Sequence, residues 1–117
     1  MTAGDLARAL EAPITGGLDV AVPGQLEAVF DQIRQRWGKL DILVHSIAFA
    51  PLNDLRGGLL DCSAEGFAKA MDVSCHSFIR MARLAAPLMK DGGTIFAMTY
   101  HGAMKVEPNY NVMGPVK

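Results

Sequence analysis

The chain has 117 residues, enough for one small domain and too few for two. Its composition is 50% hydrophobic and 20% charged with a formal net charge of -1, so neither a nucleic-acid-binding surface nor an acidic disordered arm is indicated. No apolar run approaches the roughly 20 residues of a membrane span, and the N-terminus lacks the apolar core of a signal peptide. Cys62 and Cys75 fit no zinc or redox spacing, so we expect a cytoplasmic chain with free thiols and no metal.

The first half of the chain predicts two helices and two strands. Asp5 to Glu11 is predicted as a short helix, and Ile14 to Val20 as a weak strand interrupted by two glycines. Apolar spacing then predicts an amphipathic helix that ends at a left-handed cap, Gly38; its buried face is expected to hold Leu26, Val29, Phe30, Ile33 and Trp37. The nearly continuous apolar run from Leu40 to Ala48 predicts a strand buried on both faces, as in a parallel sheet.

The second half predicts a loop, a long helix, a strand and the start of another helix. After the loop from Pro51 to Asp61, Ser63 is the expected N-cap of a helix from Ala64 to Lys90. Its predicted buried side holds Phe67, Ala70, Met71, Ser74, Phe78, Met81, Ala82, Ala85 and Leu88. Thr94 to Tyr100 is predicted as a strand, and Pro108 to Lys117 as the start of a helix.

Strands that alternate with helices of these lengths indicate an α/β fold with a parallel sheet. Ligands of such folds bind outside the carboxyl ends of the strands. Here those ends are Val44 to Pro51 and Met98 to His101, and we expect the chemistry there. His45, within an apolar strand, is interpreted as a hydrogen-bonded core histidine, and Ser74 and Ser77 as packing groups on a helix face.

Two motifs lie at or near these ends: HSIAFAP at residues 45–51, and PNYNVMG at residues 108–114, followed by Lys117. Together they resemble the FabI-type enoyl-acyl-carrier-protein reductases, a divergent branch of the short-chain dehydrogenase/reductase superfamily. The resemblance covers residues 18–117. Tyr110 and Lys117 stand seven residues apart, whereas the wider superfamily carries Tyr-x-x-x-Lys; the fourth residues after Tyr100 and Tyr110 are Met104 and Gly114. A general carbonyl reductase is therefore a weaker interpretation.

The resemblance implies an incomplete, doubly wound Rossmann-like parallel sheet with flanking helices, as one partial NAD(P)-binding domain over residues 1–117. Nothing before Asp19 matches the glycine-rich first turn of the family, and the family continues past Lys117, so the chain is expected to be truncated at both ends. Its first strand would be separated from the others by two missing strands, at roughly 14 Å, leaving unpaired edges. Pro115 is expected to disturb a helix that begins near Asn109, at a cost of about 3 kcal/mol.

The resemblance also assigns the site residues. Three residues are expected to be catalytic. Tyr110 donates to the developing enolate oxygen, and Tyr100 lines the acyl pocket. Lys117 is the third, and it also holds the ribose of the cofactor. Two turns of a straight helix would place Tyr110 and Lys117 on one face. The expected cofactor contacts, with NADH (NAD) as the cofactor, are Asp19 and Val20 at the adenine, and Ser46, Ile47 and Ala48 along the dinucleotide. Without the resemblance, the alternative interpretation of Asp19 is simply a turn residue.

The implied function is NADH hydride transfer to a trans-2-enoyl thioester on acyl carrier protein, in type II fatty-acid biosynthesis. The family also implies a homo-oligomer, a tetramer, with neither nucleic acid nor membrane as a partner. The alternative is a non-catalytic remnant that acts as an oligomerisation fragment, because the glycine-rich turn is absent.

Overall fold

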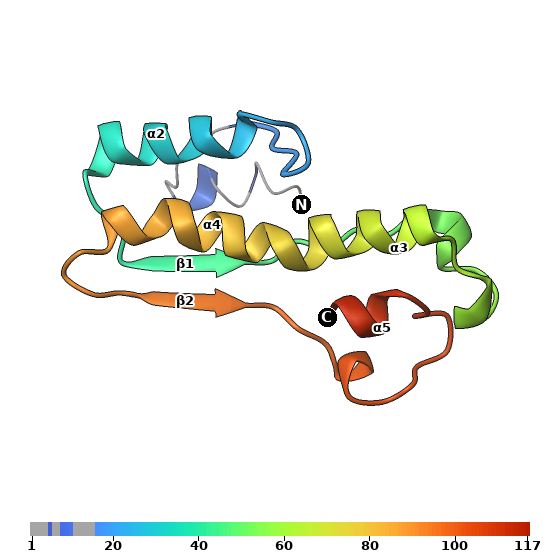
Figure 1. Ribbon diagram of the computed structural model, residues 1–117. Coiled ribbons are helices and arrows are strands. Elements are labelled where there is room, and N and C mark those ends of the chain that lie inside the picture. Colours follow the sequence, from blue (N-terminus) through green and yellow to red (C-terminus); the bar gives the residue numbers. More distant parts are fainter. Residues whose placement is uncertain (1–4, 6–7, 11–15) are drawn as a thin grey trace.

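The computed structural model describes Asp5, residues 8–10 and residues 16–117. Two parallel strands, β1 (Ile42–His45) and β2 (Thr94–Ala97), are joined by a long helical crossover (Figure 1). Ile42 lies opposite Thr94, and His45 lies opposite Ala97. The predicted α/β fold with a parallel sheet is therefore confirmed, although each strand is shorter than its apolar run.

Helix α2 (Gln25–Trp37) is the predicted amphipathic helix. It ends at Gly38, whose φ of 71° is left-handed and whose N–H donates to the Arg34 carbonyl. Leu26 and Phe30 are buried as expected. Trp37 is not: its side chain is 56% exposed, because the core beneath α2 ends near Ile33.

The predicted long helix is continuous from residue 64 to residue 88 but changes pitch. It comprises α3 (Ala64–Met71), a π-helical turn (Asp72–His76), α4 (Ser77–Ala85) and a 3-10 turn (Ala86–Leu88). The expectation that Phe67 faces the core is wrong. In α3 the buried residues are Gly66 and Ala70, since the wider π turn rotates the helix face between its two halves.

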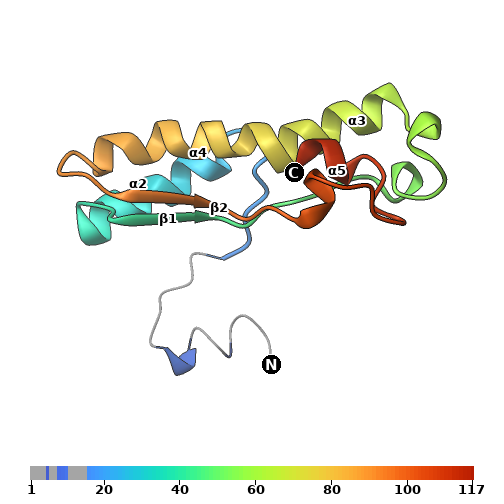
Figure 2. The ribbon, with the colours of Figure 1, turned by 90° about the horizontal axis from the view of Figure 1, so that it is seen from below.

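One face of the sheet carries the main core (Figure 2). Helices α2 and α4 pack there, and the cluster contains Val20, Leu26, Phe30, Leu40, Leu43, Val73, Met81, Ala85 and Leu88. The expected burial of β1 on both faces is wrong in the described part of the chain. Ile42 and Val44 point away from the core and are 58% and 53% exposed, because both helices lie on the opposite face.

The predicted N-terminal elements fall largely outside the described residues. Asp5, Arg8 and Ala9 are helical and Leu10 is in a turn, whereas the other residues of the expected first helix lie outside the described residues. The strand expected from Ile14 to Val20 is absent from its described part, residues 16–20. A strand needs a neighbour for its backbone groups, and no strand of the described residues lies beside this segment.

A second, smaller core holds the C-terminal segment. Helix α5 (Met113–Val116) lies beside α3, and the cluster contains Ala70, Val112, Met113 and Val116. This cluster fixes the segment around Tyr110 against the crossover helix, at the end of the molecule where both strands finish (Figure 1).

Candidate active site

Tyr110 lies in a turn and not in a helix. Its neighbours Asn109 and Asn111 have positive φ values of 60° and 41°, a conformation that asparagine tolerates better than most residues. The helix begins only at Met113. The expectation that Tyr110 and Lys117 share one helix face is therefore wrong, because the two left-handed residues interrupt the helix before it can include Tyr110.

The late start of α5 also removes the expected conflict at Pro115. Pro115 is the third residue of a helix that begins at Met113. The first amides of a helix have no intrahelical acceptor, so the missing N–H of proline costs no hydrogen bond there. The predicted penalty of about 3 kcal/mol, which applies to a helix interior, does not arise.

Tyr100 and Tyr110 are brought together. Their ring centroids are 4.8 Å apart and the rings are inclined at 69°, an edge-to-face contact. Gly102 lies beneath both rings. A Cβ atom added there would lie 2.5 Å from Cδ1 of Tyr110 and 3.0 Å from Cδ1 of Tyr100. Sequence reasoning missed Gly102, because no spacing in the sequence indicates its contact with Tyr110.

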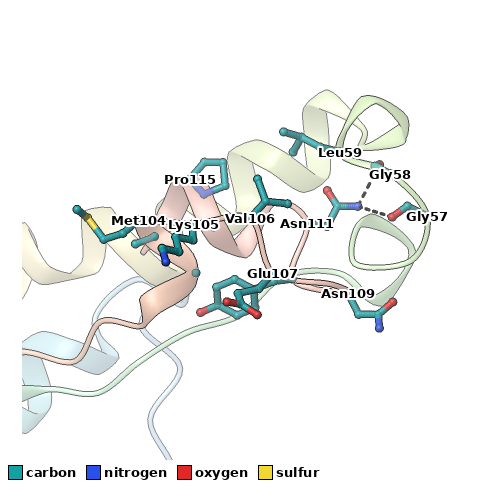
Figure 3. Close-up of a pocket in the computed structure, with 14 residues that line it drawn as sticks. Gly57, Gly58, Leu59, Met104, Lys105, Val106, Glu107, Asn109, Asn111 and Pro115 are labelled. Carbon is teal, nitrogen blue, oxygen red and sulfur yellow. Dashed lines mark hydrogen bonds between the residues drawn. The ribbon is translucent and has the colours of Figure 1, made fainter.

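A cavity of about 460 Å³ opens beside Tyr110. Loop residues from 57–59 and 102–107 line it together with the Tyr110 turn. Figure 3 shows the Asn111 side chain directed at the loop, where its Nδ2 atom donates to the carbonyl oxygens of Gly58 (3.1 Å) and Gly57 (3.4 Å). Asn111 therefore joins two walls of the cavity.

The phenol of Tyr110 is held in its protonated form. Burial raises the pKa of Tyr110 above its usual value of 10.0, and the neighbouring Tyr100 raises it further. Tyr110 is thus a neutral O–H group beside a cavity, which is the state that a hydrogen-bond donor requires.

Lys117 lies where β2 ends. Its ammonium group donates to the Met98 carbonyl (3.1 Å), and its own carbonyl accepts from the Thr99 hydroxyl (3.0 Å). One of its three ammonium hydrogens is engaged in that way. Lys117 is not among the residues that line the Tyr110 cavity, so the structure brings it to the same edge of the sheet without bringing it into that cavity.

His45 is the hydrogen-bonded core histidine that the sequence predicts. It is 2% exposed, and its Nε2 atom lies 2.7 Å from the Ser77 hydroxyl, which itself donates to the Val73 carbonyl at 2.6 Å. Ser77 therefore accepts from Nε2–H. Burial lowers the pKa of His45 below 6.5, and the positive charge of Lys117 lowers it further.

Three of the predicted cofactor residues lie together. Asp19, Val20 and Ile47 line a second cavity of about 450 Å³, with Leu18, Phe49, Lys69 and Val73. Ser46 and Ala48 are exposed on the loop after β1 and do not line it. Asp19 is also a turn residue, because its carboxylate accepts from the Ala21 N–H at 2.9 Å.

Ser74 fixes the loop that follows β1. Its hydroxyl accepts from the Phe49 N–H at 2.9 Å and donates to the Phe49 carbonyl at 3.0 Å. Both backbone groups of one loop residue are therefore held by one side chain of the π turn. Sequence reasoning treated Ser74 as a packing group and missed this role.

Neither a metal nor a membrane span is indicated by the described residues. Within residues 16–117, Asp5 and residues 8–10, no three His, Cys, Asp or Glu side chains gather as metal ligands. In the same part of the chain, no helix is long and apolar enough to cross a membrane.

The parallel strand–helix–strand unit, with its cavities at the carboxyl ends of the strands, defines a Rossmann-like α/β fold. The model of the family described as "Enoyl-(Acyl carrier protein) reductase" matches residues 1–117, and the chain belongs to this family.

Individual relatives agree with the family assignment. The chain is 48% identical over 99 residues to "Enoyl-[acyl-carrier-protein] reductase [NADH] 2" of Rhizobium meliloti, covering 85% of this chain and 37% of that protein. Among solved structures, the enoyl-acyl-carrier-protein reductase from Anaplasma phagocytophilum in complex with NAD has a TM-score of 0.92 at 40% identity, covering 97% of this chain and 44% of the other. FabI from Candidatus Liberibacter asiaticus gives 0.90 at 42% identity, covering 97% and 44%. The chain thus spans less than half the length of these relatives.

Proposed function

We propose that this chain carries the tyrosine donor and part of the cofactor site of an NADH-dependent enoyl-acyl-carrier-protein reductase. The observation that carries the proposal is the Tyr110 phenol, kept protonated beside a cavity and packed against Tyr100, within the motif PNYNVMG. The substrate class is a trans-2-enoyl thioester carried on acyl carrier protein, in fatty-acid biosynthesis. Residues 1–117 act as one partial NAD(P)-binding domain.

Tyr110 provides the electrostatic part of the reaction. When bound, NADH supplies a hydride for the β-carbon of the enoyl group. Negative charge then develops on the thioester oxygen, and the Tyr110 O–H donates a hydrogen bond to that oxygen as an enolate forms. A phenol is protonated at neutral pH already at its usual pKa of 10.0, and burial together with Tyr100 raises the pKa of Tyr110 further in the same direction. Tyr100 supports the ring of Tyr110. It is not among the residues that line the Tyr110 cavity, and its assignment to the acyl pocket rests on the family resemblance.

The cavity that Asp19, Val20 and Ile47 line fits the adenine end of the cofactor. It has a carboxylate to accept from an amino group and apolar walls against which a flat ring can pack. Ser46 and Ala48, exposed at the end of β1, would lie along the dinucleotide. The Lys117 ammonium group donates one hydrogen to the Met98 carbonyl, and it would donate the remaining hydrogens to the ribose hydroxyls.

The same proposal includes the assembly and the location. The subunits associate as a homo-oligomer, a tetramer in the family, and neither nucleic acid nor a membrane takes part. Cys62 and Cys75 are free thiols, which supports the cytoplasm as the compartment.

A second candidate function is a non-catalytic fragment that associates with itself or with an intact reductase. The observation that favours it is the apolar open face of the sheet, where Ile42, Val44 and Phe96 are each more than half exposed. Size-exclusion chromatography without NADH tests this candidate: association is expected, and a monomer at micromolar concentration would contradict it.

The reductase proposal is tested by NADH oxidation with a crotonyl thioester. Tyr110→Phe retains the ring and removes only the donor, so turnover is expected to fall by about 100- to 1000-fold. Circular dichroism of both proteins controls for folding. Activity that survives in the variant would refute the role of Tyr110, and a folded, unaltered chain without turnover would favour the non-catalytic candidate.

A further inference from the structure

The turn that contains Asp19 and Val20 has local hydrogen bonds that fix its shape. The Ala21 N–H donates to the Asp19 carboxylate (2.9 Å), the Val22 N–H donates to the Asp19 carbonyl (3.1 Å), and the Asp19 N–H donates to the Gln25 side chain (2.8 Å). All of these partners lie within six residues of one another along the chain. They cannot fix where the turn lies relative to the crossover helix, whose Val73 forms another wall of the second cavity.

Arg80 supplies that long-range connection. From helix α4, its Nη2 atom donates to the Val20 carbonyl at 3.0 Å, across 60 residues of sequence. Its other terminal nitrogen, Nη1, donates to the Asp72 carboxylate at 2.6 Å and lies 2.9 Å from Nδ1 of His76. The Arg80 side chain is only 28% exposed. Asp72 therefore holds one arm of the guanidinium group while the other arm holds the turn.

The geometry requires arginine. The guanidinium group is planar, so holding one nitrogen at Asp72 restricts the direction of the second nitrogen. A lysine has a single ammonium group on a flexible stem and does not reproduce two donors at a fixed separation. Arg83, on the same helix, is exposed and makes no hydrogen bond or ion pair among the described residues, which makes it a matched control.

We propose that Arg80, oriented by Asp72, is a positioning residue that sets the specificity of the site for the adenine of the cofactor. The inference rests on the proposed function, in which Asp19 and Val20 meet the adenine. Arg80 acts through the Val20 backbone and does not touch the cofactor. Loss of its contact lets the turn move, which weakens recognition of the adenine amino group and leaves the nicotinamide end unchanged.

Calorimetric titration with NADH and with its deamino analogue, in which hypoxanthine replaces adenine, tests the proposal. The unaltered chain is expected to prefer NADH. Arg80→Lys is expected to weaken NADH binding by about tenfold, the worth of one charge-assisted hydrogen bond, with a smaller effect on deamino-NADH. Arg83→Lys should change neither. Asp72→Asn, which retains Arg80 but weakens its orientation, should reduce the preference in the same direction.

Different outcomes distinguish the failure of each idea. If the unaltered chain binds neither dinucleotide, the proposed function fails and this inference with it. If the chain prefers NADH but Arg80→Lys and Asp72→Asn weaken both dinucleotides equally, or neither, Arg80 has no role in adenine recognition. Urea unfolding of each variant shows that it is folded, and Asp72→Asn decides the question if Arg80→Lys does not fold.

Discussion

Gly102 is the residue on which the arrangement of the two tyrosines depends. It is buried, and its missing side chain leaves the space that the edges of both rings occupy. Its carbonyl also lies against α5, since a Cβ atom on Gly114 would be only 3.1 Å from that oxygen. One small residue therefore supports both the ring of Tyr110 and the helix that follows it.

Gly102→Ala is expected to destabilise the fold and displace Tyr110. The added methyl would come within 2.5 Å of the Tyr110 ring, and overpacking of this kind costs about 1–3 kcal/mol. Urea unfolding measures the loss, and near-ultraviolet circular dichroism reports the tyrosine environment. Gly17→Ala is the matched control, because nothing lies within 4 Å of its added methyl. Equal stability of the two variants would contradict the argument.

Single residues were predictable where a motif surrounds them. Tyr110 stood out because PNYNVMG is specific, and His45 because an apolar strand predicts a partner for a buried imidazole. Gly102 and Asn111 were not predictable, since their contacts cross from one loop to another. Sequence spacing describes neighbours within one element, and the two left-handed asparagines that shape this turn leave no periodic pattern.

At the scale of elements, the start of α3 is built from two separate segments, residues 63–66 and the loop that carries Asp54. Ser63 caps the helix by accepting from the Gly66 N–H at 2.9 Å, as its position predicted. The carboxylate of Asp54, buried at 6% exposure, accepts from the Ser63 N–H at 2.5 Å. A Cβ atom on Gly66 would lie 1.9 Å from that carboxylate. A negative charge thus sits at the positive end of α3, in space that Gly66 leaves open.

A double-mutant cycle tests this arrangement. Gly66→Ala alone should destabilise the chain by about 1–3 kcal/mol, because the methyl and the Asp54 carboxylate cannot occupy the same space. In an Asp54→Ala background the obstacle is absent, so the same substitution should cost at least about 1 kcal/mol less. Urea unfolding of the four proteins gives the coupling. Additive losses would show that the carboxylate and Gly66 do not compete.

The crossover helix was predicted correctly as an element, but its π turn and the orientation of Phe67 were not. Its length, its cap and its end near the glycine pair were predictable from local signals. The π turn was not, because its partner contacts lie elsewhere: Ser74 holds Phe49, and Ser77 holds His45. These tertiary bonds favour the wider turn, and the helix face that Phe67 occupies turns outward as a result.

At the scale of the whole molecule, the stability is expected to depend on pH through His45. Its pKa is lowered in the folded chain and is near 6.5 when unfolded, so the unfolded chain binds more protons below pH 6.5. The contribution of His45 is therefore fully present above pH 6.5 and is lost as the pH falls through the lowered pKa. One such group changes the free energy of unfolding by at most about 1.4 kcal/mol per pH unit.

Urea unfolding at pH 7.5 and at pH 5.5 measures this dependence. The unaltered chain should lose stability between the two values, and His45→Gln, which cannot be protonated, should lose less. His101→Gln is the matched control, because His101 is exposed. An identical loss in all three proteins would assign the pH dependence to other groups.

The fold class of the whole molecule was predictable from the sequence, but the faces of the sheet that the helices cover were not. Alternating apolar and helical segments indicated a parallel sheet, and β1 and β2 are parallel. The continuous apolar run of β1 indicated two covered faces, whereas Ile42 and Val44 are more than half exposed in the described chain. The sequence of a strand indicates which of its faces are apolar enough to be buried, but it does not indicate which partner covers each face.

The pairing of β1 with β2 has a consequence for synthesis on the ribosome. Ile42 pairs with Thr94, so a growing chain exposes the first strand for about fifty further residues before its partner exists. At about 5–20 residues per second, that interval lasts roughly 3–10 s. During this time the apolar strand lacks its β2 partner and the crossover helix is unfinished, and they are the segment that a ribosome-associated chaperone is expected to shield.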